Sequence, residues 1–328
     1  MSFSRYNTDD SVISSETVVR GLWSGDNNSI SNFFTASTYS EYYLDVYNNC
    51  ELCSGSSVQF AIQYGNVSGR GSKLINTAVT GASPSRIVYG EYRNLVYGTE
   101  DAYFSFDNGA TTGSDIFVIN VARNRYKESL LPGSFNLTLA SGSNSIRLTD
   151  DSGTTNLTRY IGENRVFYII SGSNGNAYTS AASSSYYGMM FPDLDIIVLN
   201  ATSSTTVNLL PYFTALGTST STPQNNHVKL YNSIVSGSSF QLRSQETVSS
   251  RYFFTRVKNS EFNYTTNPSI IDANGNLLYT TLINNPQTYV TTVGMYNDNN
   301  ELLAVAKLSK PLTKDFTKEA LIRIKLDY

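Results

Sequence analysis

The chain contains two cysteines, Cys50 and Cys53, at the CxxC spacing that can support a redox disulfide or half of a zinc site. A zinc site would need a second pair of ligands, but there is no second cysteine pair and the single histidine, His227, lies far along the chain. No βαβ pattern surrounds the two cysteines. We therefore expect ordinary reduced thiols, with a local disulfide and a metal half-site between subunits as the alternatives.

The only imidazole that could serve as a general base is that of His227. No GxSxG motif accompanies it, and no carboxylate that would orient the ring can be identified, so the sequence does not indicate a serine or cysteine hydrolase. We interpret His227 as a histidine at the surface or at the start of a helix.

Two acidic segments imitate functional sites. Residues 272–276, DANGN, begin like a calcium loop, but Leu277 stands where that loop needs glycine and Ile283 where it needs glutamate, so we predict a hairpin turn. Asp150 and Asp151 are adjacent, and neighbours on a strand point to opposite faces; the Ser-Gly that follows favours a turn. The paired carboxylates of a glycoside hydrolase need proximity in space, and the sequence nominates no such pair.

The composition favours a β-rich protein that does not bind nucleic acid. Charged residues make up 15% of the chain, the net charge is -3, and lysine and arginine do not cluster, which argues against nucleic-acid binding. The 24 tyrosines, with threonine, valine and isoleucine, favour strands. Tyrosines could also line a carbohydrate groove, but their spread over the whole length is more typical of core and interface positions. We predict no catalytic residue, no cofactor and no metal.

No targeting or membrane segment is apparent. The amino terminus has no apolar stretch like that of a signal peptide, and no apolar run approaches the roughly 20 residues that span a bilayer. We expect a protein that is made in the cytoplasm, stays soluble and has no membrane partner.

The length of 328 residues favours two or three domains. Residues 1–55 carry aromatic anchors in polar surroundings, which predicts an extended N-terminal arm with short strands. Short alternating runs bounded by turn formers, such as VQFAIQYG at 58–65, predict a central β-rich domain over residues 56–216. A loop rich in serine, threonine and proline then separates it from a C-terminal β domain, residues 227–328.

The predicted fold class is mainly β, with domains resembling a β-sandwich or barrel and few short helices. Apolar residues recur at helical spacing in three segments, 86–98, 121–131 and 226–237, and the glycine at the end of the third suits a helix C-cap.

The last 38 residues are patterned for a hairpin and a further strand. VTTVGMY and LLAVAKL flank NDNNE, whose asparagines and aspartate suit a hairpin loop, so we expect the two runs to pair antiparallel. In the run LIRIKLDY, alternation places four apolar side chains on one face. These are Ile322, Ile324, Leu326 and Tyr328.

Four segments of the chain carry a resemblance to known proteins: TTVGMYNDNNELLAVAKLSKPLTKDFTKEALIRIKLDY, NSEFNYTTNPSIID, ETVVRGLWSG and VYGEYRNLVYG. They resemble a family of virion structural proteins from large contractile-tailed phages, especially those that infect cyanobacteria. The resemblance implies a non-enzymatic component of the phage particle that works through contacts with other virion proteins, in several copies. The run GMYNDNNELLAVAK is similar to segments of baseplate and fibre-attachment proteins, which favours a place in the tail baseplate.

Other functions remain open alongside this one. A neck or head-associated virion protein, a host-facing fibre or carbohydrate-binding module, and a polysaccharide-degrading enzyme are the alternatives. If the chain is a virion structural protein, aromatic and apolar side chains at its interfaces are the expected functional residues. They are Trp23, Tyr42, Tyr43, Ile322, Ile324, Leu326 and Tyr328.

Overall fold

The computed structural model confirms a mainly β protein, with 46% of residues in strands and 13% in helices. The structure describes residues 5–35, 43–50, 53–72, 83–100, 102–106, 112–155, 158–202, 208–222, 224–263, 267–284 and 286–327. Two of the expected interface residues, Tyr42 and Tyr328, lie outside these ranges.

The chain divides into two compact units. The larger one, called the sheet unit below, is formed by residues 17–246. The smaller one, called the hairpin unit below, combines residues 1–16 with residues 247–328. The segment that the sequence groups as an N-terminal arm is therefore divided between the two.

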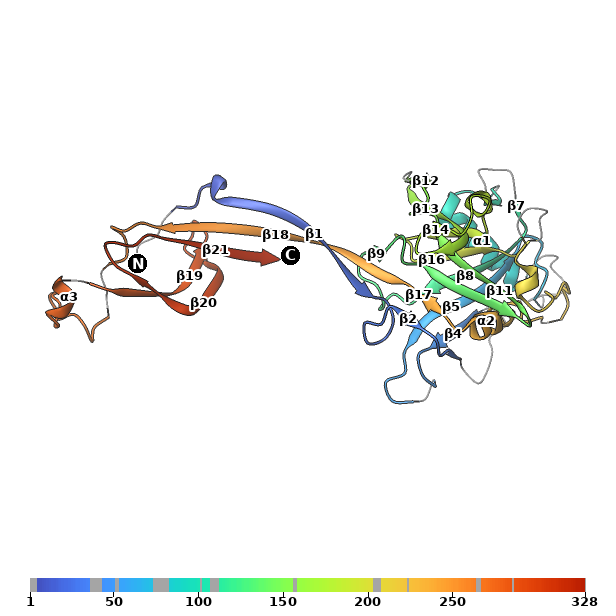
Figure 1. The fold of residues 1–328 in the computed structure, drawn as a ribbon, viewed down its shortest axis with the longest axis horizontal. Helices are drawn as coiled ribbons and strands as arrows, with labels where there is room; N and C mark the ends of the chain where they lie inside the picture. The colour runs from blue at the N-terminus through green and yellow to red at the C-terminus, as the bar shows by residue number, and fades with distance from the viewer. Residues whose placement is uncertain are drawn as a thin grey trace. The chain divides into compact units, whose positions relative to one another are not determined.

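The sheet unit is built on one large antiparallel sheet that curls into a half-barrel (Figure 1). Its main path runs β2 (Ser29–Ile30), β17 (Phe240–Gln241), β10 (Asn136–Ser141), β11 (Asn144–Asp150), β13 (Asn164–Ser173), β15 (Gly188–Phe191), β16 (Ile196–Asn200), β8 (Asp115–Val121), β5 (Val58–Asn66), β4 (Tyr43–Tyr47) and β3 (Phe34–Thr35). β12 (Arg159–Ile161) and β14 (Asn176–Ala177) also pair with β13, while β6 (Phe104–Ser105) and β7 (Thr112–Gly113) form a small separate sheet.

Both faces of the central strands are buried. Along β8, Phe117 and Ile119 belong to one core cluster, whereas Ile116 and Val118 belong to a second one. Strands buried on both faces read as nearly continuous apolar runs, as DIFVINV does. The predicted alternation of β5 is confirmed, since its residues Phe60, Ile62 and Tyr64 all lie in the first cluster.

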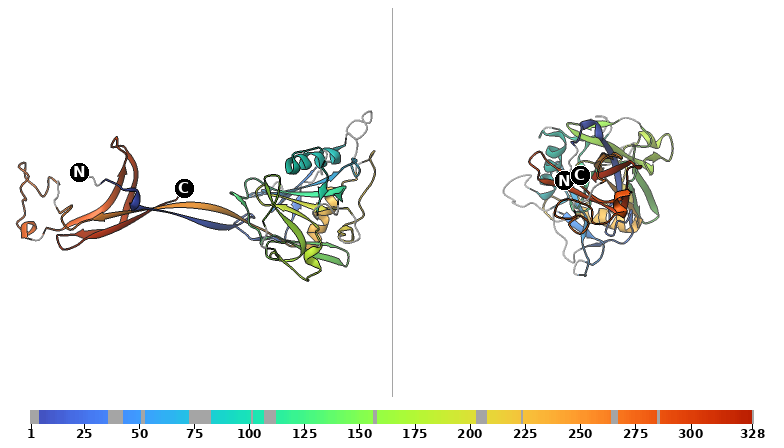
Figure 2. Two further views of the ribbon diagram at one scale, coloured as in Figure 1. Left: turned by 90° about the horizontal axis from the view of Figure 1, so that it is seen from above. Right: turned by 90° about the vertical axis from the view of Figure 1, so that its left-hand side faces the viewer.

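The two long helices cover opposite faces of this sheet. Helix α2 (Asn226–Gly237) contributes Leu230 and Ile234 to the first cluster, and helix α1 (Pro84–Tyr97), teal in Figure 2, contributes Tyr89 and Tyr92 to the second. Their positions confirm two of the three predicted helices. The residue capping α2 is Ser238, in the left-handed conformation, and Gly237 belongs to the last helical turn.

The helix predicted over residues 121–131 is wrong. Val121 ends β8, a turn follows, and Ser129–Leu130 forms the short strand β9. The guanidinium of Arg125 donates to the carbonyl of Val58 at 3.2 Å and to the hydroxyls of Ser24 and Ser57 at 3.0 and 2.8 Å. These long-range contacts outweigh a weak local helical pattern.

The hairpin unit is formed largely from strands. β1 (Ser11–Gly21), β18 (Arg243–Val257) and β21 (Ala320–Asp327) are neighbours in that order, and the first residues of β1 and the last residues of β18 belong to this unit. The pairing of β9 with Ser244 and Gln245 of β18 lies within the sheet unit. The strands β19 (Thr288–Tyr296) and β20 (Leu302–Lys314) form a separate two-stranded sheet, and α3 (Thr281–Asn284) is a single helical turn. The remaining elements are the 3-10 turns η1 (Thr8–Asp10), η2 (Ala182–Ser184) and η3 (Leu210–Tyr212).

The pairing predicted for the last 38 residues is confirmed. β19 and β20 pair antiparallel, with Val293 opposite Ala306 and Met295 opposite Ala304. β21 forms a strand in which Ile324 lies opposite Phe253 of β18.

Candidate functional site

The two cysteines are joined in a disulfide, so the prediction of reduced thiols is wrong and the local disulfide is the form that the structure has. The two residues lie close together: the amide of Cys53 donates to the carbonyl of Cys50 at 2.9 Å, and their Cα atoms are 5.2 Å apart. This separation lies within the range that a disulfide can bridge. In the described ranges, no group of three or more histidine, cysteine, aspartate or glutamate side chains is placed to hold a metal ion.

The single histidine lies at the start of a helix but not at the surface. His227 is the second residue of α2 and is only 3% exposed, so the expected helix start is confirmed and the alternative surface position is wrong.

The segment that imitates a calcium loop is a turn, as predicted. Ile271 and Leu277 form an antiparallel bridge across it. The carboxylate of Asp272 accepts the backbone amides of Asn274 and Asn276 at 2.9 and 2.8 Å, and these bonds hold the pKa of Asp272 below its usual range. The carboxylate therefore stabilises the turn itself.

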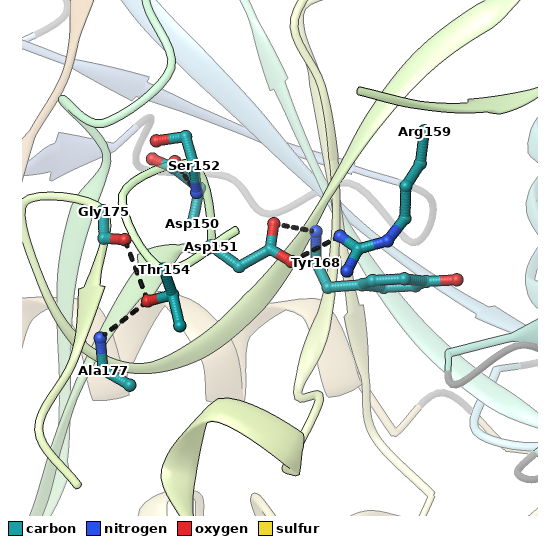
Figure 3. Close-up of polar contacts among 8 residues, drawn as sticks. All are labelled: Asp150, Asp151, Ser152, Thr154, Arg159, Tyr168, Gly175 and Ala177. Atoms are coloured by element: carbon teal, nitrogen blue, oxygen red, sulfur yellow. Dashed lines mark hydrogen bonds and ion pairs between the residues drawn. The ribbon is translucent and has the colours of Figure 1, made fainter. Parts of the chain in front are cut away.

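Asp150 and Asp151 point in different directions, as their positions on a strand and turn predict (Figure 3). Both carboxylate oxygens of Asp150 accept the amide of Gly133 at 2.9 Å, and one of them also accepts the amide of Ser152 at 3.1 Å. Burial raises the pKa of Asp150. This carboxylate anchors the turn around Gly133 to the end of β11.

Asp151 belongs to a second set of contacts. One of its oxygens accepts the backbone amide of Tyr168 at 3.0 Å, and the other forms an ion pair with Arg159 at 2.5 Å. The guanidinium of Arg159 lies 4.9 Å from the centre of the Tyr168 ring (Figure 3). The pair thus holds β12 and the turn before it against β13. Each carboxylate has structural partners, so the geometry gives neither one the role of a catalytic acid.

The turn after Asp151 is also fixed to the next hairpin. The hydroxyl of Thr154 donates to the carbonyl of Gly175 at 3.3 Å and accepts the amide of Ala177 at 3.1 Å, as Figure 3 shows. The whole cluster is a structural network that joins three turns of the sheet unit.

A cavity of about 530 Å³ lies at one end of β5 and β8 in the sheet unit. It is lined by Tyr64, Arg70, Asp115, Ala201, Thr202, Leu210, Phe213, Ala215, Leu216, Gly217 and Thr218. The carboxylate of Asp115 accepts the hydroxyl of Tyr64 at 2.5 Å, the amide of Asn66 at 2.6 Å and the hydroxyl of Ser114 at 2.8 Å. Burial, with the Asp115 charge, raises the pKa of Tyr64. The acidic group of this cavity is thus already engaged by three donors from the chain itself.

The residues expected at interfaces lie in different environments. Trp23 is 3% exposed and contacts the rings of Phe60 and Phe240, with centroids 5.8 and 4.9 Å away, so it anchors its segment inside the sheet unit. Tyr43 on β4 is exposed. On β21, Ile322 is buried and Ile324 and Leu326 are half-buried, on the face that the alternation predicts.

The hairpin unit buries few apolar side chains. Among its described residues only Phe253, Val257 and Ile322 are buried hydrophobics, and neither large core cluster includes any of its residues. Its large exposed hydrophobics are Tyr6, Val12, Ile13, Phe262, Leu278, Tyr279, Ile283, Tyr289, Tyr296, Leu302, Leu303, Val305, Phe316 and Leu321. Exposed apolar surface on this scale is typical of a region that binds a partner.

Most of these exposed residues were not singled out from the sequence. The signal that could have found them is in LLAVAKL, where Leu302 and Leu303 are adjacent and Ala304, Val305 and Ala306 continue the run. On a strand, consecutive apolar residues make both faces apolar. A hairpin with two apolar faces needs cover on both sides.

None of the helices in the described residues is long and apolar enough to cross a membrane. Comparison of the chain with protein-family models, with curated proteins and with solved structures gives no match.

Proposed function

We propose that this chain is a non-enzymatic structural subunit of a phage particle, with the tail baseplate of a contractile-tailed phage as its place. The observation that carries the assembly role is the hairpin unit, which orders long strands around only three buried apolar side chains in its described part. The placement in a phage tail rests on the resemblance of residues 291–328 and three further segments to virion proteins.

The contacts of the carboxylates support a structural role over an enzymatic one. Asp150, Asp151 and Asp115 each accept hydrogen bonds from the chain's own donors. A general acid or base must instead reach the proton that it transfers. In the described residues, the best-formed acidic clusters therefore serve the fold.

The hairpin unit supports an interface role through the chemistry of its surface. Tyrosine, leucine and valine side chains such as Tyr289, Leu303 and Val305 are more than half exposed. Aromatic and apolar side chains are what the centre of a protein interface contains, and they gain free energy when a partner removes them from water.

The first experiment asks whether the chain is a component of a particle. Purified particles of the encoding phage are analysed by mass spectrometry, and antibody labelling in electron micrographs locates the chain. We expect the chain in every particle and the label at the baseplate end of the tail. Label on the head or neck would support the alternative virion position, and particles without the chain would overturn the proposal.

A second experiment tests the terminal strand. Deleting residues 321–328 removes Ile322, Ile324 and Leu326 from their places against β18. In a phage whose defect can be complemented, we expect a lower melting temperature for the purified protein and particles with defective tails. Intact infectious tails built from a truncated chain that melts like the wild type would show that this strand is dispensable.

A further inference from the structure

The hairpin β19–β20 carries apolar side chains on both of its faces. On one face, five half-buried side chains follow the alternation of the two strands: Val293, Met295, Ala304, Ala306 and Leu308. On the other face, Leu303 is 62% exposed and Val305 is 59% exposed, and the exposed Lys307 follows them. A two-stranded hairpin is only marginally stable in water unless its apolar face packs against another element. The described residues do not provide a core that would cover both faces.

The charge of the hairpin unit indicates what could cover it. Residues 1–16 and 247–328 contain ten lysines and arginines and ten aspartates and glutamates, so this unit is neutral, and the sheet unit carries the whole net charge of -3. A neutral surface with both signs interspersed does not repel a copy of itself, and proteins near zero net charge tend to associate. A strongly basic or strongly acidic partner would meet no net charge of the opposite sign on the hairpin unit.

The edges of the hairpin are also complementary to themselves. Within the described residues, β19 and β20 pair only with each other, so neither strand has a further strand paired along its outer edge. Two identical edges related by a twofold axis can pair antiparallel, because each residue then meets its partner in the same way from both sides. Such pairing would extend the sheet, and packing of the apolar faces would remove them from water.

We infer that the hairpin β19–β20 is a contact between copies of this chain, and that the protein is a homo-oligomer held together by it. The copies cover one another's apolar faces at Val293, Met295, Leu303 and Val305. A stable interface buries about 800 Å² on each partner, which takes some 20 to 30 residues. β19 contains 9 residues and β20 contains 13, so the hairpin has the number of residues that such a contact takes. The inference depends on the assembly role proposed above, but not on the kind of particle.

The test measures the molar mass of the purified full-length chain by size-exclusion chromatography with light scattering. The wild type is expected at a multiple of 36.1 kDa at micromolar concentration. The double variant Leu303→Lys, Val305→Lys places charges on exposed positions, where it creates no cavity, and is expected at 36.1 kDa. A melting curve of the variant that retains the main transition of the wild type shows that the sheet unit is still folded.

A matched control makes the same change elsewhere. Ile87 and Leu95 lie on α1 in the sheet unit, are 54% and 48% exposed, and are replaced by lysine together. This control should keep the mass of the wild type. A wild type that is monomeric on its own, a hairpin variant that stays oligomeric, or a control that dissociates equally would each overturn the inference. A monomeric wild type that is still found in particles would assign the hairpin to a different virion protein and leave the proposed function standing.

Discussion

The ion pair of Asp151 and Arg159 is supported by a hydrogen bond from the backbone of β13. Because Asp151 also accepts the amide of Tyr168, its carboxylate has a donor at each oxygen, which is what a buried charge needs to be tolerated. The sequence could predict that Asp150 and Asp151 diverge at a turn. It could not predict their partners, since Arg159 and Tyr168 reach them only through the pairing of β11, β12 and β13.

Replacement of Asp151 by asparagine tests this pair. The variant should lose about 3 kcal/mol of unfolding free energy, near the low end for a broken buried pair because Arg159 keeps some access to water. Urea denaturation measures the change. The control is Asp193→Asn, which removes an exposed pair with Arg165 and should cost less than about 1 kcal/mol. Equal losses in the two variants would contradict a special role for the buried pair.

The buried carboxyl group of Asp195 should make the free energy of unfolding depend on pH. Asp195 is 1% exposed, and the hydroxyl of Tyr126 and the guanidinium of Arg123 are the neighbouring groups that favour its charged form. Burial raises the pKa of Asp195 from 3.8 to about 7, and the hydrogen bond with Tyr126 and the positive charge of Arg123 offset only part of that effect. The folded chain therefore holds this proton more tightly than the unfolded chain does. Its contribution to stability is fully present below pH 3.8 and is lost as the pH rises to about 7.

The variant Asp195→Asn should remove this dependence. Asparagine tolerates the left-handed backbone at this position, where φ is 58°. We expect the variant to melt above the wild type at pH 8, with the difference shrinking as the pH falls toward 4. Thermal melts of both proteins across this range measure it. A difference that stays constant with pH would show that Asp195 does not titrate as its burial requires.

Among the elements, strands with a strong pattern were predictable and weak helical patterns were not. VQFAIQYG and RVFYIISGS alternate or run apolar over their whole length, and both form strands. Residues 121–131 fit a helical repeat only locally, and contacts of Arg125 with three distant residues decide their conformation. The disulfide depends on a close approach of Cys50 and Cys53 that the spacing allows but does not require.

Helix α2 approaches the sheet closely enough to require glycine at its end. A Cβ atom on Gly237 would lie 2.0 Å from the carbonyl oxygen of Thr138 in β10. We expect Gly237→Ala to lower the unfolding free energy by about 1–3 kcal/mol, because the helix must move away from the strand. Chemical denaturation gives the value.

A second glycine provides the control for that substitution. Gly90 lies inside α1 and a Cβ atom there would meet no atom within 4 Å. Gly90→Ala should therefore stabilise the protein by about 0.5–1 kcal/mol through the lower entropy of its unfolded chain. If both glycines gave the same sign of change, close packing of α2 on β10 would not be the reason for Gly237.

At the scale of the whole molecule, the sequence predicted the β class and the final hairpin but not the composition of the units. The hairpin unit takes residues 1–16 together with residues 247–328, a grouping that depends on pairing between distant strands. The apolar alternation at Ile322, Ile324 and Leu326 indicated a half-buried strand. The alternation carried no information about how few side chains of the hairpin unit would be buried. Burial depends on which other elements pack against a face of the sheet.

The central claim is that the hairpin unit reaches its full stability only in an assembly. Hydrogen exchange of the full-length protein, followed by mass spectrometry as the sample is diluted, tests it most directly. We expect the amides of β19, β20 and β21 to exchange much faster in the dilute sample, while those of β8, β13 and β16 in the buried sheet keep the same protection. Strong protection of β19 and β20 that does not change with concentration, in a chain whose mass is that of a monomer, would contradict it.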